Sequence, residues 1–389
     1  MGAVRLLDLG LLPSLRSQSI YHAVAHATAD DTPDTLILTS PMDPYVCIGF
    51  HQDAEREVDL DFCQGRGLPV YRRMVGGGAV YLDSRQIFTQ WVFHHGVLPA
   101  SLDARFELHI RPLVETHRAF GIDAYHRPLN DIHVKGRKIG GTGAATIGQG
   151  DVVVGSLMLD FDTDVMSRVL RVDSEKMRDK LYRSLREYVT SMARELGRAP
   201  DQGEVKAVYL RKCRDILRRE IVPGQLLPRE ELELRRWDRL LASRSWLHRT
   251  GGMSRARVKV REGVWLSEGR HKAPGGLIHA VVCVRDGRID DLALSGDFTM
   301  LPASGIALLE RAGRGLDLDR KAILGRFEQV YHAARLESPL VTPGDFADAV
   351  MGALEADRPG TADASRVNDP GTTRSSDSRV ADGHPSERR

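Results

Sequence analysis

Two short segments of this chain combine residue types that bind phosphate and carboxylate groups. The first reads YRRMVGGGAVY over residues 71–81. Its three consecutive glycines carry no Cβ, so a ligand can approach their N–H groups closely, and successive N–H groups in such a turn form an anion-binding concavity. Arg72 and Arg73 add planar guanidinium groups that match phosphate or carboxylate. The alternative interpretation is a flexible hairpin with two solvated arginines.

The second segment supplies a lysine beside small residues. Asn130 and Asp131 precede the run GRKIGGTGA over residues 136–144, which contains Lys138. A lysine ammonium is a compact charge that can hold a carboxylate oxygen and a phosphate oxygen together, and it stabilises charge that develops in a displacement. Alone, the segment could be a surface lysine beside a mobile loop. Two such clusters in one block favour a shared anion site, although neither matches a standard nucleotide-binding fingerprint.

The elements that must position these clusters form a mixed α/β block over the first 160 residues. Runs rich in β-branched and aromatic residues, bounded by turn signals, predict strands at residues 35–39, 45–50, 68–72, 87–93 and 152–161. Helical spacing predicts a helix over residues 103–120. The glycine segment therefore follows the strand predicted at residues 68–72, and the lysine segment precedes the strand predicted at residues 152–161.

The middle of the chain is predicted to be helical. Apolar residues recur at steps of three and four over residues 174–196, and Gly197 follows. The spacing predicts one long amphipathic helix whose apolar stripe belongs to the core and not to a cofactor site. Two further helices are predicted over residues 204–220 and 229–242.

Strand signals return in a third block, and a polar tail follows it. The dipeptide Asp286-Gly287 between residues 276–284 and 289–294 predicts a hairpin, and helices are predicted at residues 306–312 and 319–334. The last residues lack Leu, Ile and aromatic side chains, so they cannot bury enough apolar surface to order themselves. We therefore expect a first domain over residues 1–240, a second over 241–352 and a disordered tail over 353–389.

Composition narrows the class of protein. Apolar residues make up 42% and the formal net charge is +2, which does not indicate a protein that coats nucleic acid. The four cysteines include no C-x-x-C pair, a pattern that fits a reducing compartment. No apolar run approaches the roughly 18 residues of a membrane span. We expect a cytoplasmic protein with neither nucleic-acid nor membrane partners.

The paired motifs RRMVGGGAVYLD and NDI…GRKIGGTGAA resemble those of the lipoate–protein ligase family, within the biotin/lipoate ligase superfamily. Residues 17–24, 48–52 and 154–160 also resemble this family, and residues 276–298 resemble the accessory domain of its bacterial members. The resemblance covers about residues 1–345. It implies an α+β fold: a mixed-sheet biotin/lipoate-ligase-like catalytic domain with a small α+β C-terminal accessory domain.

The resemblance also implies a two-step reaction and its site. Lipoate and ATP would give lipoyl-adenylate, and a lysine of a lipoyl acceptor domain (2-oxoacid dehydrogenase E2 subunits or glycine-cleavage H-like proteins) would take the lipoyl group. Lys138 would be catalytic, and Mg²⁺ would accompany ATP near Asp131. The implied substrate- and ATP-binding residues are Arg72, Arg73, Gly76, Gly77, Gly78, Ala79, Val80, Tyr81, Asn130, Asp131, Gly141 and Thr142.

This chain departs from the family pattern at three places, which leaves two alternatives open. Leu82 and Val154 stand where the family has histidine, and residues 140–143 read GGTG where the family has a Ser-Gly-Ser-Ala-like turn. A non-catalytic lipoyl-binding paralogue is one alternative. An octanoyl- or lipoyltransferase that uses a cysteine thioester is the other, but Cys47 lies in a predicted strand and no cysteine follows Lys138 before Cys213.

Overall fold

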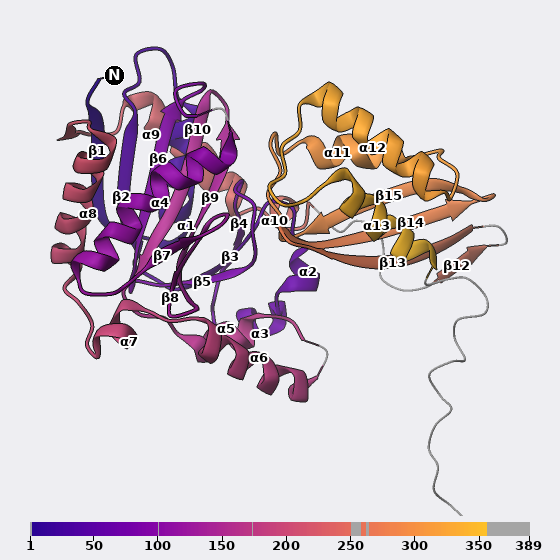
Figure 1. Ribbon diagram of the computed structural model, residues 1–389, viewed down its shortest axis with the longest axis horizontal. Coiled ribbons are helices and arrows are strands. Elements are labelled where there is room, and N and C mark those ends of the chain that lie inside the picture. The colour runs from indigo at the N-terminus through magenta and orange to yellow at the C-terminus, as the bar shows by residue number, and fades with distance from the viewer. Residues whose placement is uncertain (1, 100, 173, 250–257, 262–263, 356–389) are drawn as a thin grey trace, which may run out of the picture.

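The computed structural model describes residues 2–99, 101–172, 174–249, 258–261 and 264–355 (Figure 1). Its largest sheet contains β1 (Val4–Leu12), β2 (Thr35–Pro41), β6 (Gln86–His94), β7 (Tyr125–Arg127), β8 (Asp131–Val134), β9 (Arg137–Ile147), β10 (Gly150–Met158) and β11 (Ile221–Pro223). The order is β11-β1-β2-β6-β10-β9-β8-β7. β1 pairs parallel with β2 and β11, whereas the pairs from β2 to β7 are antiparallel, so the sheet is mixed as predicted.

Helices cover both faces of this sheet. One face packs against α1 (Ser14–His26) and α9 (Pro228–Leu241), the other against α4 (Leu102–Ala119) and α8 (Gln202–Leu217). Strand alternation explains the two cores, since the neighbours Trp91 and Val92 of β6 belong to different hydrophobic clusters. The other helices of this N-terminal unit are α2 (Ala54–Glu57), α3 (Leu60–Gly65), α5 (Thr163–Val169), α6 (Glu175–Tyr188), α7 (Met192–Leu196) and α10 (Arg244–Leu247).

A second, three-stranded sheet carries the glycine triplet. It consists of β3 (Tyr45–Ile48), β4 (Val70–Arg72) and β5 (Val80–Leu82), in the order β4-β3-β5. The predicted run of strand, glycines and strand is thus confirmed, and we call the connection over residues 73–79 the glycine loop. The loop crosses close to Gly49, where an added Cβ would lie 1.9 Å from the Gly77 carbonyl oxygen.

Two buried histidines flank the glycine loop in their neutral form. The Met74 N–H donates to His22 Nε2 at 3.1 Å, and His22 Nδ1 lies 2.8 Å from the Gln18 carbonyl oxygen. Burial lowers the pKa of His22 to about 3. Burial, followed by the nearby guanidinium groups, also lowers the pKa of His51 to about 3.

The helix predicted over residues 174–196 is wrong in extent, and the core role predicted for its apolar stripe holds only at its end, where Met192 is buried. It breaks into α6 and α7 because Val189 is extended, with φ −102° and ψ 139°, and bridges to Lys138 of β9. The apolar stripe of α6 does not enter the core: none of its residues, all of which are described, is buried, and Met177 is 50% exposed. The physical reason is that α6 contacts α5 and β9 near one end of the unit and covers neither face of the large sheet.

The small-residue segment after Lys138 is a strand and not a loop. Residues 137–147 form β9, which pairs with β8 on one side and β10 on the other. Its glycines serve close packing: a Cβ on Gly143 would lie 2.4 Å from Val75 Cγ1. Other predicted strands and helices are confirmed with small shifts at their ends, namely β2, β3, β4, β6, β10, α4, α8 and α9.

The C-terminal unit is a four-stranded antiparallel sheet with helices packed against it. Its elements are β12 (Val258–Arg261), β13 (Val264–Ala273), β14 (Gly276–Arg285), β15 (Arg288–Gly296), α11 (Gly305–Gly313), α12 (Arg320–Ala334) and α13 (Pro343–Glu355). The predicted hairpin is confirmed, with Asp286 and Gly287 at φ 50° and 77°. The unit has its own hydrophobic cluster. The expected domain boundary at residue 240 stays a prediction, and the expected tail lies outside the described residues from residue 356 onward.

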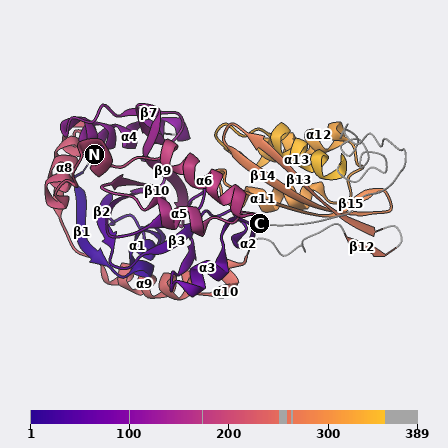
Figure 2. The ribbon, with the colours of Figure 1, turned by 90° about the horizontal axis from the view of Figure 1, so that it is seen from below.

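The C-terminal unit contacts the N-terminal unit at α2 and at the glycine loop (Figures 1 and 2). The guanidinium of Arg56 in α2 donates to both carboxylate oxygens of Glu268 in β13, at 2.6 and 3.0 Å. A Cβ on Gly76 would lie 2.7 Å from the Phe298 carbonyl oxygen. Among the described residues, no helix is both long and apolar enough to cross a membrane.

We predict that Glu230→Ala destabilises the fold. Glu230 of α9 is 0% exposed, and Arg5 Nη1 of β1 donates to its Oε2 at 3.0 Å. The variant leaves a buried guanidinium without its carboxylate, so the free energy of unfolding should fall by about 3–5 kcal/mol. Urea denaturation measures this, with the exposed neighbour Glu231→Ala as a control that changes stability by less than about 0.5 kcal/mol. Equal effects of both variants would contradict the prediction.

We also predict that the fold loses stability as the pH falls from about 6.5 toward 3. His22 and His51 stay neutral in the folded chain, whereas unfolding restores their ordinary pKa, so the unfolded state binds more protons in this range. Between pH 7 and pH 5, each histidine should cost about 2 kcal/mol. Urea unfolding at both pH values checks this. Between pH 7 and pH 5, the His22→Asn variant should lose about 2 kcal/mol less stability than the unmodified chain, because one titrating histidine is gone. An equal loss in both proteins would refute the assignment.

Candidate functional site

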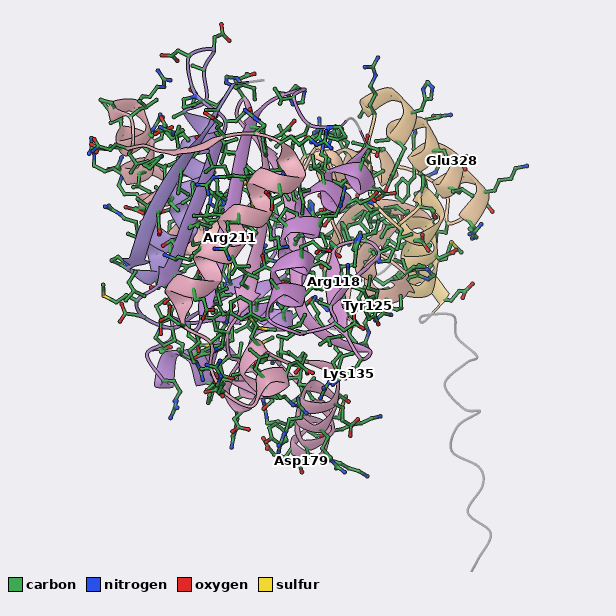
Figure 3. The ribbon with its side chains drawn as sticks, turned by 60° about the vertical axis from the view of Figure 1, so that its left-hand side comes forward. Arg118, Tyr125, Lys135, Asp179, Arg211 and Glu328 are labelled. Atoms are coloured by element: carbon green, nitrogen blue, oxygen red, sulfur yellow. The ribbon has the colours of Figure 1, made fainter. Side chains whose placement is uncertain are left out.

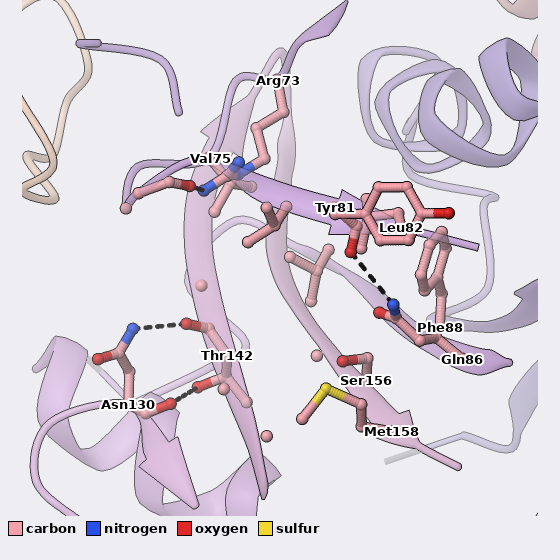
Figure 4. Close-up of a pocket in the computed structure, with 18 of the residues that line it drawn as sticks. Arg73, Val75, Tyr81, Leu82, Gln86, Phe88, Asn130, Thr142, Ser156 and Met158 are labelled. Atoms are coloured by element: carbon pink, nitrogen blue, oxygen red, sulfur yellow. Dashed lines mark hydrogen bonds between the residues drawn. The ribbon is translucent and has the colours of Figure 1, made fainter. Parts of the chain in front are cut away.

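A cavity of about 340 Å³ lies between the glycine loop, β5, β9 and β10 (Figure 4). Its volume is at the small end of pockets that hold small molecules, which span about 300–1,000 Å³. The cavity brings together residues from both sequence clusters: Arg73, Gly76, Gly77, Gly78, Ala79, Val80, Tyr81, Asn130, Lys138, Gly141 and Thr142. Arg72 and Asp131, also predicted for the site, are not among its lining residues.

Lys138 is held at the cavity by a carboxylate on the neighbouring strand. Its Nζ lies 2.6 Å from Asp131 Oδ1, and the lysine side chain is 36% exposed. A Cβ on Gly141 would lie 3.3 Å from this Nζ, so the glycine leaves room for the ammonium. An ion pair this exposed stabilises the fold by at most about 1 kcal/mol. Its main consequence is to fix a positive charge where a ligand can reach it.

Arg73 organises the glycine loop from inside the cavity wall. Its Nη2 donates to the carbonyl oxygens of Gly76 and Gly78 at 2.8 and 2.9 Å, and its Nη1 donates to that of Cys47 at 3.1 Å. The guanidinium therefore fixes the carbonyl groups of the loop. It also brings a positive charge to the cavity lining.

The Arg72 side chain bonds to the protein backbone and does not face the cavity. Its side chain is fully buried and donates to the carbonyl oxygens of Gly49, Phe50, Gln52, Trp246 and Leu247. Burial, and then Arg249, lowers the pKa of Arg72 to about 10, so the group stays charged at neutral pH. The arginine predicted to bind a ligand thus ties β4 to α10 and to the segment after β3.

Asn130 and Thr142 link the turn before β8 to β9 at the edge of the cavity (Figure 4). Asn130 Nδ2 donates to the Thr142 carbonyl oxygen at 2.6 Å, and the Thr142 N–H donates to the Asn130 carbonyl oxygen at 2.7 Å. The Asn130 side-chain amide therefore bonds to the backbone of β9, and it positions the strand that carries Lys138.

The rest of the cavity wall is largely apolar. Leu82 and Val154, the two positions where the family resemblance expects histidine, both line it. Further apolar lining residues are Val75, Val80, Phe88, Met158, Phe161, Met166, Leu185 and Val189. A pocket with apolar walls and a cation at one place suits an amphipathic ligand with a hydrocarbon chain and an acidic head group.

Motif analysis missed several polar lining residues, among them Gln18, Tyr21 and Gln90. Gln18 and Tyr21 come from α1, and Gln90 comes from the centre of β6. Gln90 is 2% exposed and its Oε1 has no hydrogen-bond partner among the described residues, whereas its Nε2 donates to the Ser17 carbonyl oxygen at 3.0 Å. A buried acceptor without a donor indicates a bound donor group or water. The family resemblance of residues 17–24 could have indicated Gln18 and Tyr21 as site residues. No local sequence pattern indicates Gln90.

The cysteines do not contribute to the cavity. All four lie within the described residues, and none is among the lining residues. Cys47, in β3 beneath the glycine loop, is 0% exposed, and burial raises the pKa of its thiol. Burial likewise raises the pKa of Cys63, Cys213 and Cys283. A thiolate nucleophile needs the opposite environment, exposed and electropositive.

The site offers few protein ligands for a metal ion. Within the part of the chain that the structure describes, no group of three His, Cys, Asp or Glu side chains could hold one. Mg²⁺ commonly takes one or two carboxylates together with phosphate oxygens and water. Asp131, the carboxylate predicted to lie near Mg²⁺, is paired with Lys138 and does not line the cavity, so its role beside Mg²⁺ stays a prediction.

Comparison with known proteins places this geometry in a family. Residues 17–214 match the family described as lipoyl protein ligase A/B catalytic domain. A lipoate-protein ligase A subunit 1 from Thermoplasma acidophilum is 29% identical over 219 residues, which cover 52% of this chain and 80% of the relative. An octanoyltransferase LipM from Symbiobacterium thermophilum is 28% identical over 264 residues, which cover 59% of this chain and 92% of the relative.

A solved structure extends the comparison to the fold. The bi-partite lipoate protein ligase of T. acidophilum, studied with its E2 lipoyl domain, has a TM-score of 0.59 and 27% identity over 66% of this chain and 100% of the other. The predicted α+β, mixed-sheet fold is thus confirmed. This chain belongs to the lipoyl protein ligase A/B catalytic domain family, which holds both lipoate–protein ligases and octanoyltransferases.

Proposed function

We propose that this protein is an ATP-dependent lipoate–protein ligase. One observation carries the proposal: the apolar cavity has Lys138 in its wall and no cysteine among its lining residues. An acyl chain can lie against Leu82, Val154 and their apolar neighbours, with its carboxylate toward the lysine. Because no cysteine lines the cavity, we propose that the acyl group is activated as a mixed anhydride with phosphate and not as a thioester.

The proposed reaction has two displacements. First, a carboxylate oxygen of lipoate attacks the α-phosphorus of ATP, the bond to the β,γ-phosphates breaks, and pyrophosphate leaves. Next, the ε-amine of an acceptor lysine attacks the acyl carbon, the bond to AMP breaks, and AMP leaves while the amine proton passes to solvent. Both steps develop negative charge on phosphate oxygens, which a fixed ammonium stabilises. Lys138 is the group we assign to this role, with Asp131 fixing its position.

The glycine loop is the proposed cradle for the substrates. Residues 76–81, which run from the loop into β5, line the cavity, and their backbone would offer N–H groups to lipoate and nucleotide oxygens. Arg73 lines the same cavity and fixes the loop carbonyls. Arg72 enters the proposal as a positioning residue, since its donors all face backbone. Mg²⁺ would neutralise phosphate charge, with Asp131 as its protein ligand.

The proposed acceptors are lipoyl domains of 2-oxoacid dehydrogenase E2 subunits and glycine-cleavage H-like proteins. The family supports this class of partner, because the T. acidophilum ligase was studied with its own E2 lipoyl domain. Incubation with ATP, lipoate or octanoate and a panel of such domains, read by intact mass, would identify the acceptor and the preferred acid.

The octanoyltransferase relative supports a second candidate function. In that case an acyl group would pass through a cysteine thioester without ATP. The carbonyl oxygen of Cys47 accepts from Arg73 of the loop, yet the Cys47 thiol is buried and its pKa is raised. A non-catalytic lipoyl-binding protein is the third candidate, because Leu82 and Val154 remove two donors that the family pattern places in the site.

We predict that Lys138→Ala lowers lipoate-dependent ATP–pyrophosphate exchange by about 10²–10³-fold, the effect of losing one fixed donor to a developing anion. Lys135→Ala is the matched control, because Lys135 belongs to the same hairpin and its side chain is 75% exposed. It should leave exchange unchanged.

Other outcomes of this assay would separate the candidates. Full exchange in Lys138→Ala would refute the role of Lys138, and no exchange in the unmodified chain would favour the binding protein. ATP-independent transfer from an octanoylated carrier protein, lost in Cys47→Ser, would establish the transferase instead.

We further propose that the C-terminal unit closes over the adenylate and shields it from water. The support is its contact with the glycine loop at Gly76 and with α2 through Arg56 and Glu268. Cysteines at positions 56 and 268, joined by a short bis-maleimide, should slow at least one half-reaction relative to the same variant without the linker. Two unchanged half-reactions would refute this movement.

A further inference from the structure

Helix α6 has one side toward the cavity and another side that exposes basic residues to solvent. On its inner side, Leu185 and the following Val189 line the cavity. On its outer side, Lys176, Lys180 and Arg183 are exposed, together with Met177. The helix thus contributes to the cavity wall on one side and exposes cations to solvent on the other.

An aromatic cluster continues this surface onto the neighbouring hairpin. The ring of buried His133 lies 6.1 Å from that of Tyr125 and 5.5 Å from that of Tyr188. The two tyrosines are 42% and 41% exposed, and Arg127 Nη1 donates to the Tyr188 hydroxyl at 3.3 Å. These contacts join β7 and β8 to the end of α6. Tyrosine and arginine of this kind are enriched in protein interfaces.

The combined surface is positively charged. We call it the basic face: the outer side of α6 with residues 125–135. Tyr125, Lys135 and Asp179 of this face follow one another from the middle of Figure 3 to its lower end. Its exposed cations are Arg127, Lys135, Lys176, Lys180, Arg183 and Arg186, and its exposed anions are Glu175, Asp179 and Glu187. The excess of cations is local, since the whole chain has a formal net charge of only +2.

The basic face is continuous with the position of Lys138. The Thr190 N–H donates to the Lys138 carbonyl oxygen at 2.9 Å, and Val189 bridges to the same residue. We take this junction as the place where an acceptor lysine reaches an acyl group held beside Lys138. The protein that carries that lysine must therefore rest its own surface on the elements around it.

We propose that the basic face is the docking surface for the lipoyl acceptor domain, and that it selects acceptors with acidic residues around the modified lysine. The inference rests on the proposed acyl transfer to protein. Complementary charge would raise the association rate and fix the orientation of the acceptor, and it would weaken as salt increases. The acyl-adenylate step needs no acceptor, so the surface should act on the second half-reaction alone.

The test compares two double charge reversals, each at exposed positions of a helix. Lys176→Glu with Lys180→Glu alters the basic face, and Arg235→Glu with Arg239→Glu alters α9, which lies over α1 on one face of the large sheet. The probe is an isolated E2 lipoyl domain with net negative charge. Three readouts are used: ATP–pyrophosphate exchange, the KM for the domain in transfer, and the Kd of the domain by calorimetry.

We expect the basic-face variant to raise the KM and Kd for the domain about tenfold at low salt, the scale of electrostatic steering. Its exchange activity should equal that of the unmodified chain, and the α9 variant should match the unmodified chain throughout. High salt should abolish the difference between variants. Lys135→Glu provides a second, single reversal if the double variant does not fold.

Other results would overturn the docking assignment. These are an unchanged KM and Kd in the basic-face variants, an equal loss in the α9 variant, or a basic face that instead holds a second copy of the chain, seen as a dimer lost on charge reversal. Failure of the proposed function looks different: the unmodified chain would give no lipoate-dependent exchange. In that case the Kd comparison still decides whether the surface binds the domain.

Discussion

The close approach of backbone to backbone at the glycine loop is the constraint on which the rest of the site depends. A Cβ at Gly49 would collide with the backbone of Gly77. A Cβ at Gly76 would collide with the backbone of Phe298 in the C-terminal unit. The loop is therefore held between β3 and the second unit, with Arg73 bonded to its carbonyl groups. Any side chain larger than hydrogen at these two glycines would push apart parts of the chain that form the cavity wall.

The charges of the site are divided between structure and chemistry. Arg72 satisfies buried carbonyl groups, and Arg73 does so while it also lines the cavity. Lys138 faces the cavity with one carboxylate behind it. This division explains how a nearly neutral chain concentrates positive potential in one place. It also separates the proposed ligase chemistry from a thioester route, whose nucleophile would have to emerge from a fully buried strand.

Sequence reasoning succeeded where local patterns decide the outcome. The glycine loop, the lysine and most strands were predictable because turn chemistry and β-rich runs are local. It failed where tertiary contacts decide: the segment after Lys138 extends into β9 because β8 and β10 pair with it, and Val189 breaks a helical pattern by pairing with Lys138. Arg72 could not be told from Arg73, since neighbouring residues on a strand point to opposite sides and the sequence does not show which side holds the cavity. Gln90 could not be predicted because only the fold brings it to the cavity.

The exposure of α6 has a consequence for how this protein can change over generations. A helix that buries no side chain tolerates surface substitutions at a cost within about 0.5 kcal/mol, whereas the glycine loop tolerates almost none. The solvent side of α6 and the glycine loop thus differ in how much change of sequence the fold allows. Charge and shape can therefore change on the solvent side of α6 without endangering the fold, while the part of the cavity wall formed by the glycine loop stays the same.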